Sequence, residues 1–100
     1  MEKREYKIIY KKSAAISISK IAHYIERKGY PITANRFTSK LYQFGSSLAD
    51  FPDKYPICRK EVWAKHNLRC AVYNKNYIFL YKLINYELVI FNVVHVLTIA

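Results

Sequence analysis

A basic stretch near the middle of the chain carries the residue types that RNA cleavage would need. Its cations are Lys54, Arg59, Lys60, Lys65 and Arg69, and its nearby acids are Asp53 and Glu61. Cleavage requires a base for the 2′-hydroxyl, an acid for the leaving 5′-oxygen and cations that stabilise the developing phosphorane charge. Arg69 is the strongest single candidate, because a guanidinium can bind a phosphate through two parallel hydrogen bonds.

Histidine and tyrosine side chains supply the candidate acids, bases and stacking groups. His66 and His95 are candidates for acid or base, because histidine is the usual proton donor and acceptor at neutral pH, and Tyr77 or Tyr81 could stack on a base or donate a proton. Each also has a structural interpretation, because such residues in apolar strands more often belong to a core or an interface. If the chain is a ribonuclease, we expect Arg69, His95 and Tyr81 to be catalytic. We expect contacts with RNA or another target from Lys54, Arg59, Lys60, Lys65, Arg69 and Tyr77.

The cysteine, histidine and glycine residues predict neither a metal site nor a cofactor. The three histidines lack the spacing of zinc ligands, no Cys-x-x-Cys pair is present, and two glycines cannot build a phosphate-binding loop. Cys58 and Cys70 would face each other if they lay on neighbouring strands joined by a turn near Ala64. A disulfide is then geometrically possible, but cytosolic proteins usually keep such thiols reduced, and we favour reduced thiols.

The first half of the chain predicts one strand and a pair of helices. Arg4–Tyr10 alternates in the manner of a strand. Apolar residues then recur at helical spacing between Ser13, the expected N-cap, and Gly29, the expected end of the helix. A second helical stripe begins at Pro31 and ends before Pro52. These two stripes predict a helical hairpin whose apolar faces pack on a sheet.

The second half predicts a sheet. Residues 51–56 contain two prolines and must form a loop. Ile57–Trp63 shows a weak alternation of apolar and polar residues, and we expect it to be the first strand of a meander. The meander continues through three apolar runs, His66–Asn74, Tyr77–Leu83 and Leu88–His95. The whole pattern predicts an α+β fold in a single domain, residues 1–100. We expect the hairpin on one face of a mostly antiparallel sheet of four or five strands.

Charge and strand composition predict a macromolecular partner. The chain has 17 Lys and Arg against 7 Asp and Glu, a net charge of +10, which favours polyanionic partners. The strands are apolar on both faces, with Tyr77, Phe79 and Tyr81 on one and Ile78 and Leu80 on the other, so we expect a partner protein to cover the second face. No apolar run reaches the roughly 20 residues of a membrane span, and the charged N-terminus is unlike a signal peptide, so we expect a cytoplasmic protein.

Short motifs follow one another along the chain in a characteristic order. They are Ile21-Ala22-His23-Tyr24-Ile25, Asn35-Arg36-Phe37, Leu48-Ala49-Asp50-Phe51-Pro52, Leu68-Arg69, Asn76-Tyr77-Ile78-Phe79-Leu80-Tyr81 and Val93-Val94-His95. Their order and spacing resemble the RelE/ParE superfamily of bacterial toxins over essentially the whole chain. The resemblance implies the toxin of a type II toxin–antitoxin system, neutralised by an acidic antitoxin encoded beside it, with a heterotetramer as one candidate assembly.

The superfamily divides by target. RelE-like members cleave messenger RNA on the ribosome, whereas ParE-like members poison DNA gyrase, and the hairpin that ends in Phe51-Pro52 is closer to the ParE-like branch. Asn92 stands where the family often has arginine, and residues 96–100 carry no charge where many members have arginines after the closing His95. We therefore favour a ParE-like gyrase inhibitor. The alternatives are a RelE-like ribosome-dependent endoribonuclease and a non-toxic basic RNA-binding domain.

Overall fold

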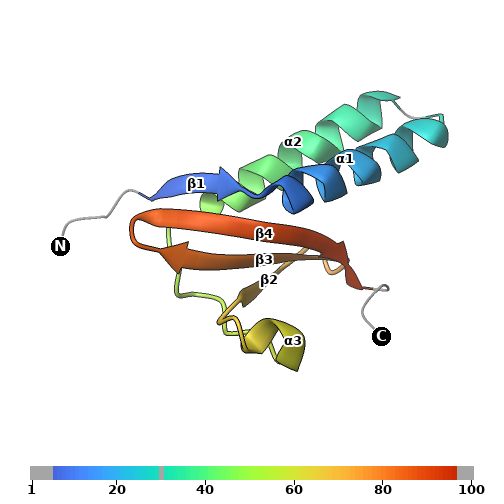
Figure 1. Ribbon diagram of the computed structural model, residues 1–100. Helices are drawn as coiled ribbons and strands as arrows, with labels where there is room; N and C mark the ends of the chain where they lie inside the picture. Colours follow the sequence, from blue (N-terminus) through green and yellow to red (C-terminus); the bar gives the residue numbers. More distant parts are fainter. Residues whose placement is uncertain (1–5, 30, 97–100) are drawn as a thin grey trace.

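The observed order of elements matches the predicted strand, helical hairpin and meander, with one short helix added. A computed structural model describes residues 6–29 and 31–96. Its elements are β1 (Lys7–Tyr10), α1 (Lys12–Arg27), α2 (Pro31–Ser47), α3 (Glu61–Ala64), β2 (Arg69–Tyr73), β3 (Tyr77–Ile84) and β4 (Glu87–His95). Figure 1 shows α1 and α2 on one side of the sheet and α3 on the other. The α+β prediction is confirmed.

The sheet has four strands in the order β1-β4-β3-β2. The meander strands pair antiparallel, whereas β1 pairs with β4 in parallel, from Lys7 opposite Glu87 to Tyr10 opposite Ile90. A parallel pairing needs a long connection between the two strands, and here the helical hairpin, α3, β2 and β3 all lie between β1 and β4 in sequence. Between β3 and β4 the register shifts at Leu80/Tyr81. Tyr81 pairs with Ile90, whereas Leu80 pairs with Asn92, so β4 has one extra residue at this point.

The main core lies between the helical hairpin and the facing side of the sheet. Its ten buried residues come from both helices and from β2, β3 and β4: Ala14, Ile18, Leu41, Leu48, Ala71, Phe79, Tyr81, Leu88, Ile90 and Val93. Phe44 of α2 joins them, with ring centroids 4.9 Å from Tyr73 and 5.0 Å from Phe79. The apolar stripes of both helices and the alternation of β3 therefore face the core as predicted.

The hairpin ends differ in one detail from the sequence prediction. Helix α1 begins at Lys12 and has no side-chain N-cap, so the prediction that Ser13 is the N-cap is wrong. Ser13 lies in the first turn, where its hydroxyl donates a hydrogen bond of 2.5 Å to the carbonyl of Phe91 and ties the helix to β4. Gly29 has φ +87°, and its N–H donates to the carbonyl of Glu26, so it terminates α1 as predicted.

The opposite face of the sheet, the back face, is covered in part by the chain itself. The covering stretch is residues 57–68, called the back-face segment below. Within it, Ile57–Trp63 was expected to be the first strand of the meander, and this prediction is wrong. Only Ile57 pairs with the sheet, opposite Arg69, and Glu61–Ala64 form the single helical turn α3. The segment folds over the sheet because Cys58 and Leu68 bury themselves against Leu80 there.

Gly45 allows β1 and α2 to approach closely, and its replacement tests this packing. A Cβ at position 45 would overlap the Tyr10 hydroxyl and lie 3.1 Å from Cδ1 of Ile90. Both neighbours belong to the packed core, so we expect Gly45→Ala to lower the free energy of unfolding by about 1–3 kcal/mol, even though alanine favours the helix. Urea denaturation measures the change.

Two further variants control the Gly45 measurement. Ser46→Ala changes the neighbouring exposed helix position and should stay within about 0.5 kcal/mol of the parent. The double variant Gly45→Ala/Tyr10→Phe removes the overlapping hydroxyl and should recover much of the loss. A single Gly45→Ala protein as stable as the parent would show that β1 and α2 do not pack in this way.

Candidate functional site

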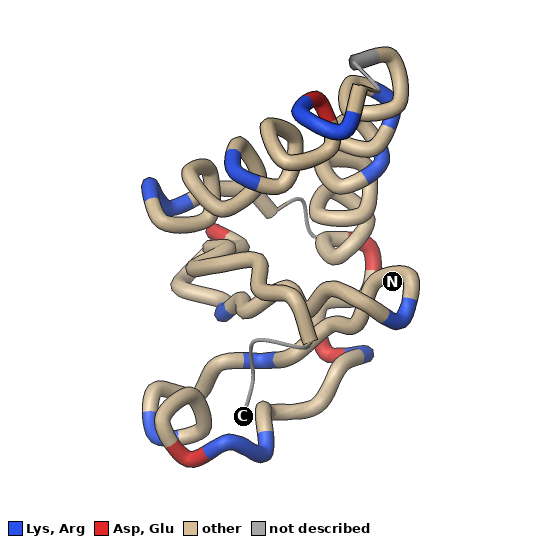
Figure 2. Tube along the Cα trace, turned by 90° about the vertical axis from the view of Figure 1, so that its right-hand side faces the viewer, with Lys and Arg blue, Asp and Glu red and all other residues tan. Residues whose placement is uncertain are grey.

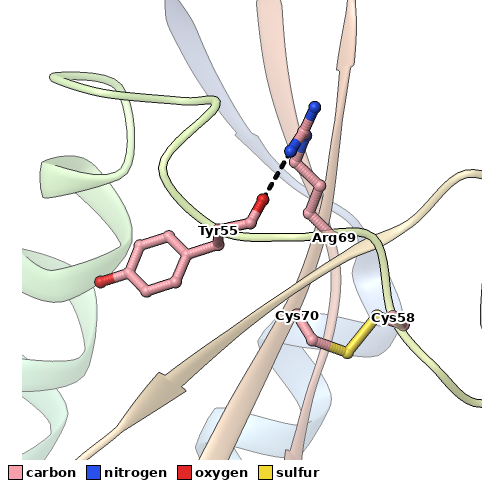
Figure 3. The surroundings of a disulfide bond; sticks show 4 residues. All are labelled: Tyr55, Cys58, Arg69 and Cys70. Atoms are coloured by element: carbon pink, nitrogen blue, oxygen red, sulfur yellow. Dashed lines mark hydrogen bonds between the residues drawn. A yellow bond between two sulfur atoms is a disulfide. The ribbon is translucent and has the colours of Figure 1, made fainter.

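Arg69, the first residue of β2, binds the loop between α2 and the back-face segment. Its Nη1 donates a hydrogen bond of 2.5 Å to the carbonyl of Tyr55 (Figure 3). Its Nη2 lies 3.4 Å from a carboxylate oxygen of Asp53. The Arg69 side chain is 26% exposed, whereas that of Asp53 is 82% exposed. The guanidinium therefore fastens residues 53–55 to the edge of the sheet, and only part of it remains open to a ligand.

Tyr81 lies opposite Arg69 on β3 and is fully buried. Its hydroxyl donates a hydrogen bond of 2.6 Å to the carbonyl of Pro52. Burial raises the pKa of Tyr81 to about 12, although the Arg69 charge acts in the opposite direction. Because the ring is covered and the proton is held by a carbonyl, Tyr81 can neither stack on a base nor serve as a proton donor to RNA without rearrangement.

Tyr77 and His95 form a separate cluster at the other end of the β3–β4 pair. Their rings meet edge to face with centroids 5.0 Å apart, and the ring of Phe37 from α2 lies 5.3 Å from that of Tyr77. Burial raises the pKa of Tyr77. Four residues separate Tyr77 from Tyr81 along β3, roughly 13 Å at the rise of a strand. The structure thus brings Arg69 and Tyr81 together and places His95 away from both.

The other predicted binding residues lie on the surface around α3. Lys54, Arg59, Lys60 and Lys65 are all exposed. Two of them rest over aromatic rings, with Nζ of Lys54 5.4 Å from the Tyr55 ring and Nζ of Lys60 5.3 Å from the Trp63 ring. Figure 2 shows Lys and Arg residues, with an acidic residue among them, around the short helix at the bottom of the view. Lys54 precedes this region, in the loop that follows α2. The group, Lys54, Arg59, Lys60 and Lys65, is called the α3 cations below.

A second basic surface on α1 was not singled out from the sequence. A shallow depression of about 700 Å³ is lined by Ser19, Lys20, His23, Tyr24, Arg27 and Lys28. Tyr24 is 64% exposed, and Nζ of Lys28 lies 5.3 Å from the centroid of its ring. Lys20, Arg27 and Lys28 recur at helical spacing on the polar side of the predicted stripe, so the same periodicity that located the core could have located this surface.

Asn92 has a structural position in β4. Its Oδ1 accepts hydrogen bonds from the Ser17 hydroxyl at 2.6 Å and from the Val93 N–H at 2.9 Å. Together with the bond from Ser13 to Phe91, this contact ties α1 to β4 just beyond the register shift. An arginine here could not reproduce these bonds, because a guanidinium has no acceptor.

Cys58 and Cys70 form a disulfide, so the preference for reduced thiols is wrong. Their Cα atoms lie 5.0 Å apart, and Figure 3 shows the bond on the side of β2 away from the Arg69 guanidinium. The pairing of Ile57 with Arg69 brings the two cysteines together, with hydrogen bonds from Cys58 N–H to Leu68 and from Cys70 N–H to the carbonyl of Pro56.

The part of the chain that the structure describes has neither a cluster of metal ligands nor a membrane-spanning helix. No three His, Cys, Asp or Glu side chains within residues 6–29 and 31–96 group closely enough to hold a metal ion. None of the described helices is long and apolar enough to cross a membrane.

Comparison with known proteins gives a family match and similar solved structures. Residues 8–98 match the family described as the ParE toxin of the type II toxin–antitoxin system parDE. The fold is similar to a chain of the chromosomal ParDE toxin–antitoxin system from P. aeruginosa, with a TM-score of 0.77 and 13% identity over 91% of this chain and 96% of that chain. It is also similar to a chain of the toxin–antitoxin complex RelBE2 from Mycobacterium tuberculosis, with a TM-score of 0.69 and 17% identity over 94% of both chains. No curated protein sequence gives a significant match.

Proposed function

Because the chain belongs to the ParE toxin family of type II toxin–antitoxin systems, we propose that it inhibits DNA gyrase by binding and does not cleave RNA. The target comes from the ParE-like resemblance, and the mode of action comes from the geometry of the candidate residues. We further propose that the protein acts in the cytoplasm, where gyrase and its DNA are found.

The separation of the candidate catalytic residues carries the proposal. General acid–base catalysis needs proton donors and acceptors within hydrogen-bond reach of one substrate. Here Tyr81 is buried on the carbonyl of Pro52, Arg69 is tied to Tyr55 and Asp53, and His95 stacks against Tyr77 roughly 13 Å away along the sheet. Asn92 already serves the packing of α1 on β4. This arrangement favours an inhibitor that acts through its surface.

The α3 cations are the surface that we assign to the target. They are exposed and are opposed locally by Glu61 and Asp53 alone among residues 53–65. Clustered cations of this kind complement an acidic protein surface or DNA and accelerate encounter with it. Trp63 and Tyr55 beneath two of them add aromatic area.

An acidic antitoxin is the second partner that we propose. The net charge of +10 favours an acidic chain, and exposed apolar side chains on the hairpin, Ile16, Tyr24, Ile32 and Tyr42, offer it contact area. A segment that wraps the domain commonly buries on the order of 2,000 Å². Co-expression with the acidic protein encoded beside this chain should give a complex that survives about 1 M salt, because much of such an interface is apolar. Its mass tests the heterotetramer, and recovery of free toxin alone would contradict the pairing.

Two assays on the purified protein separate the mechanisms. We expect inhibition of gyrase supercoiling and intact message in a translating extract. The charge-reversed variant Arg59→Glu/Lys65→Glu should weaken inhibition by about tenfold or more, because attraction to a polyanionic target is replaced by repulsion. The matched variant Lys20→Glu/Arg27→Glu makes the same charge change on α1 and should inhibit as the parent does. Codon-specific cuts in ribosome-bound message, with gyrase unaffected, would instead establish the ribonuclease alternative.

A further inference from the structure

The back-face segment is a closed loop whose two ends are fastened at one point. The Cys58–Cys70 disulfide joins the ends, and hydrogen bonds from the N–H of Cys58 to Leu68 and from the N–H of Cys70 to Pro56 lie beside it. Between these ends the segment makes one helical turn, and its other backbone hydrogen bonds are local, such as those from Ala64 to Lys60 and from Leu68 to Trp63. The segment is therefore joined to β2 chiefly at its base.

The segment packs on its own small hydrophobic cluster, separate from the main core. Three residues of this cluster are buried, Cys58, Leu68 and Leu80, whereas the main core buries ten, none of them from residues 57–68. Three buried side chains are few against the entropy lost when a segment of this length is ordered. The main core and the hairpin do not depend on the segment, so it can open without unfolding the domain.

The disulfide is chemically open to exchange. Cys58 is 4% exposed, but Cys70 on the edge strand β2 is only half-buried. A dithiol reductant attacks one sulfur, the Cys58–Cys70 bond breaks, and a mixed disulfide forms. The second thiol of the reductant then displaces the protein sulfur. Two electrons and two protons pass to the protein, which gains two thiols, while the reductant becomes a cyclic disulfide.

We propose that the Cys58–Cys70 disulfide is a redox latch on the back-face segment. In the oxidised protein the segment covers Leu80 and partly covers Ile78, Phe91 and Val94, which stand on the same cluster. In the reduced protein the segment opens, uncovers this apolar patch, and releases Arg59, Lys60 and Lys65 from a fixed arrangement. In a compartment where thiol reductants predominate the latch is open, and an oxidising challenge closes it.

Amide hydrogen exchange on the purified full chain tests the latch. Thiol titration should count no free thiol after oxidation with glutathione disulfide and two after treatment with dithiothreitol. Peptides from residues 57–68 should then exchange roughly tenfold faster or more, whereas peptides from α1, α2 and β4 should change by less than about twofold. Binding of a hydrophobic dye should rise in parallel, because the patch around Leu80 becomes accessible.

A matched variant and clear contrary results complete the experiment. Cys58→Ser/Cys70→Ser should reproduce the open state without reductant and should not respond to dithiothreitol. If that variant fails to fold, the comparison of the parent protein before and after reduction still decides. Two free thiols that persist after treatment with glutathione disulfide, equal exchange of residues 57–68 in both states, or a uniform loss of protection throughout the domain would each overturn the proposal. None of these results depends on gyrase or an antitoxin.

Discussion

Raising the pH from about 9 to about 12 should destabilise this protein by up to about 3 kcal/mol through Tyr81 alone. The pKa of Tyr81 is raised from 10.0 to about 12, chiefly because a buried phenolate would lack the hydration that it has in the unfolded chain. The folded state therefore holds its proton where the unfolded chain has already released it. The stability from this phenol is fully present below pH 10 and disappears as the pH rises through about 12. Urea midpoints measured across this range follow the loss.

The variant Tyr81→Phe isolates this contribution from the titration of lysines and other tyrosines. At about pH 8 the variant should be less stable by about 1–3 kcal/mol, because the Pro52 carbonyl loses its hydrogen bond in a buried setting. As the pH rises toward 12 the gap between the two proteins should close. Tyr24→Phe, at a position 64% exposed, should keep a constant offset from the parent. Parallel curves for the parent and Tyr81→Phe would show that the phenol is not buried as described.

The pKa of Tyr10 is also raised to about 12, by burial and then by the neighbouring Tyr42. It contributes in the same direction and over the same pH range as Tyr81, so the alkaline loss in the parent exceeds what Tyr81→Phe removes. Both phenols face the seam between the helical hairpin and the sheet. Alkaline conditions therefore act on the packing of α1 and α2 on the sheet.

The helical hairpin and the meander could be predicted from the sequence because each repeats a pattern over many residues. Leu41 of α2 and Leu48 just after it are fully buried at helical spacing, and Phe79 and Tyr81 of β3 are fully buried at strand spacing. Helix α3 escaped prediction for the opposite reason. A single turn shows no period, and it is held by the burial of Leu68 against Leu80, which lies far from it in sequence.

Which candidate residues lie close together depends on the register between β2, β3 and β4, and the sequence defines this register only in part. The three-residue break after Tyr73 places Tyr77 opposite it, and counting back then sets Arg69 opposite Tyr81, as the structure has it. Counting in the same way from the turn after Ile84 would place Tyr77 opposite Val94. The register shift at Leu80/Tyr81 moves its partner to His95. Because one residue of slip changes the face of every later side chain, the Tyr77–His95 cluster could not be predicted without that bulge.

The prediction of reduced thiols was wrong because it relied on the usual redox state of cytosolic proteins, although the expected positions of the two cysteines already allowed a disulfide. Cys58 and Cys70 were placed correctly on neighbouring segments, but the segment that carries Cys58 crosses the back face and does not run along it as a strand. The same crossing explains why the chain covers part of an apolar face that had been assigned to a partner protein. Val72, 51% exposed, is one residue of this face that remains open.

Arg69→Ala should lower the free energy of unfolding by about 2–3 kcal/mol. A charge-assisted hydrogen bond to the Tyr55 carbonyl is worth about 1.5–3 kcal/mol, and the pair with the exposed Asp53 adds at most about 1 kcal/mol. Urea denaturation measures the change. Arg59→Ala removes an exposed cation ten residues earlier and should stay within about 0.5 kcal/mol of the parent.

The same variant separates a structural Arg69 from a catalytic one. A ribonuclease that relied on Arg69 to stabilise transition-state charge would lose roughly 10²–10³ in rate on substitution. A toxin that uses Arg69 to hold its loop should instead keep its inhibitory strength per folded molecule, with less folded protein at a given temperature. Inhibition is therefore compared after the folded fraction has been measured. An Arg69→Ala protein of unchanged stability that has lost toxicity, together with the loss of message cuts made by the parent, would assign Arg69 to catalysis.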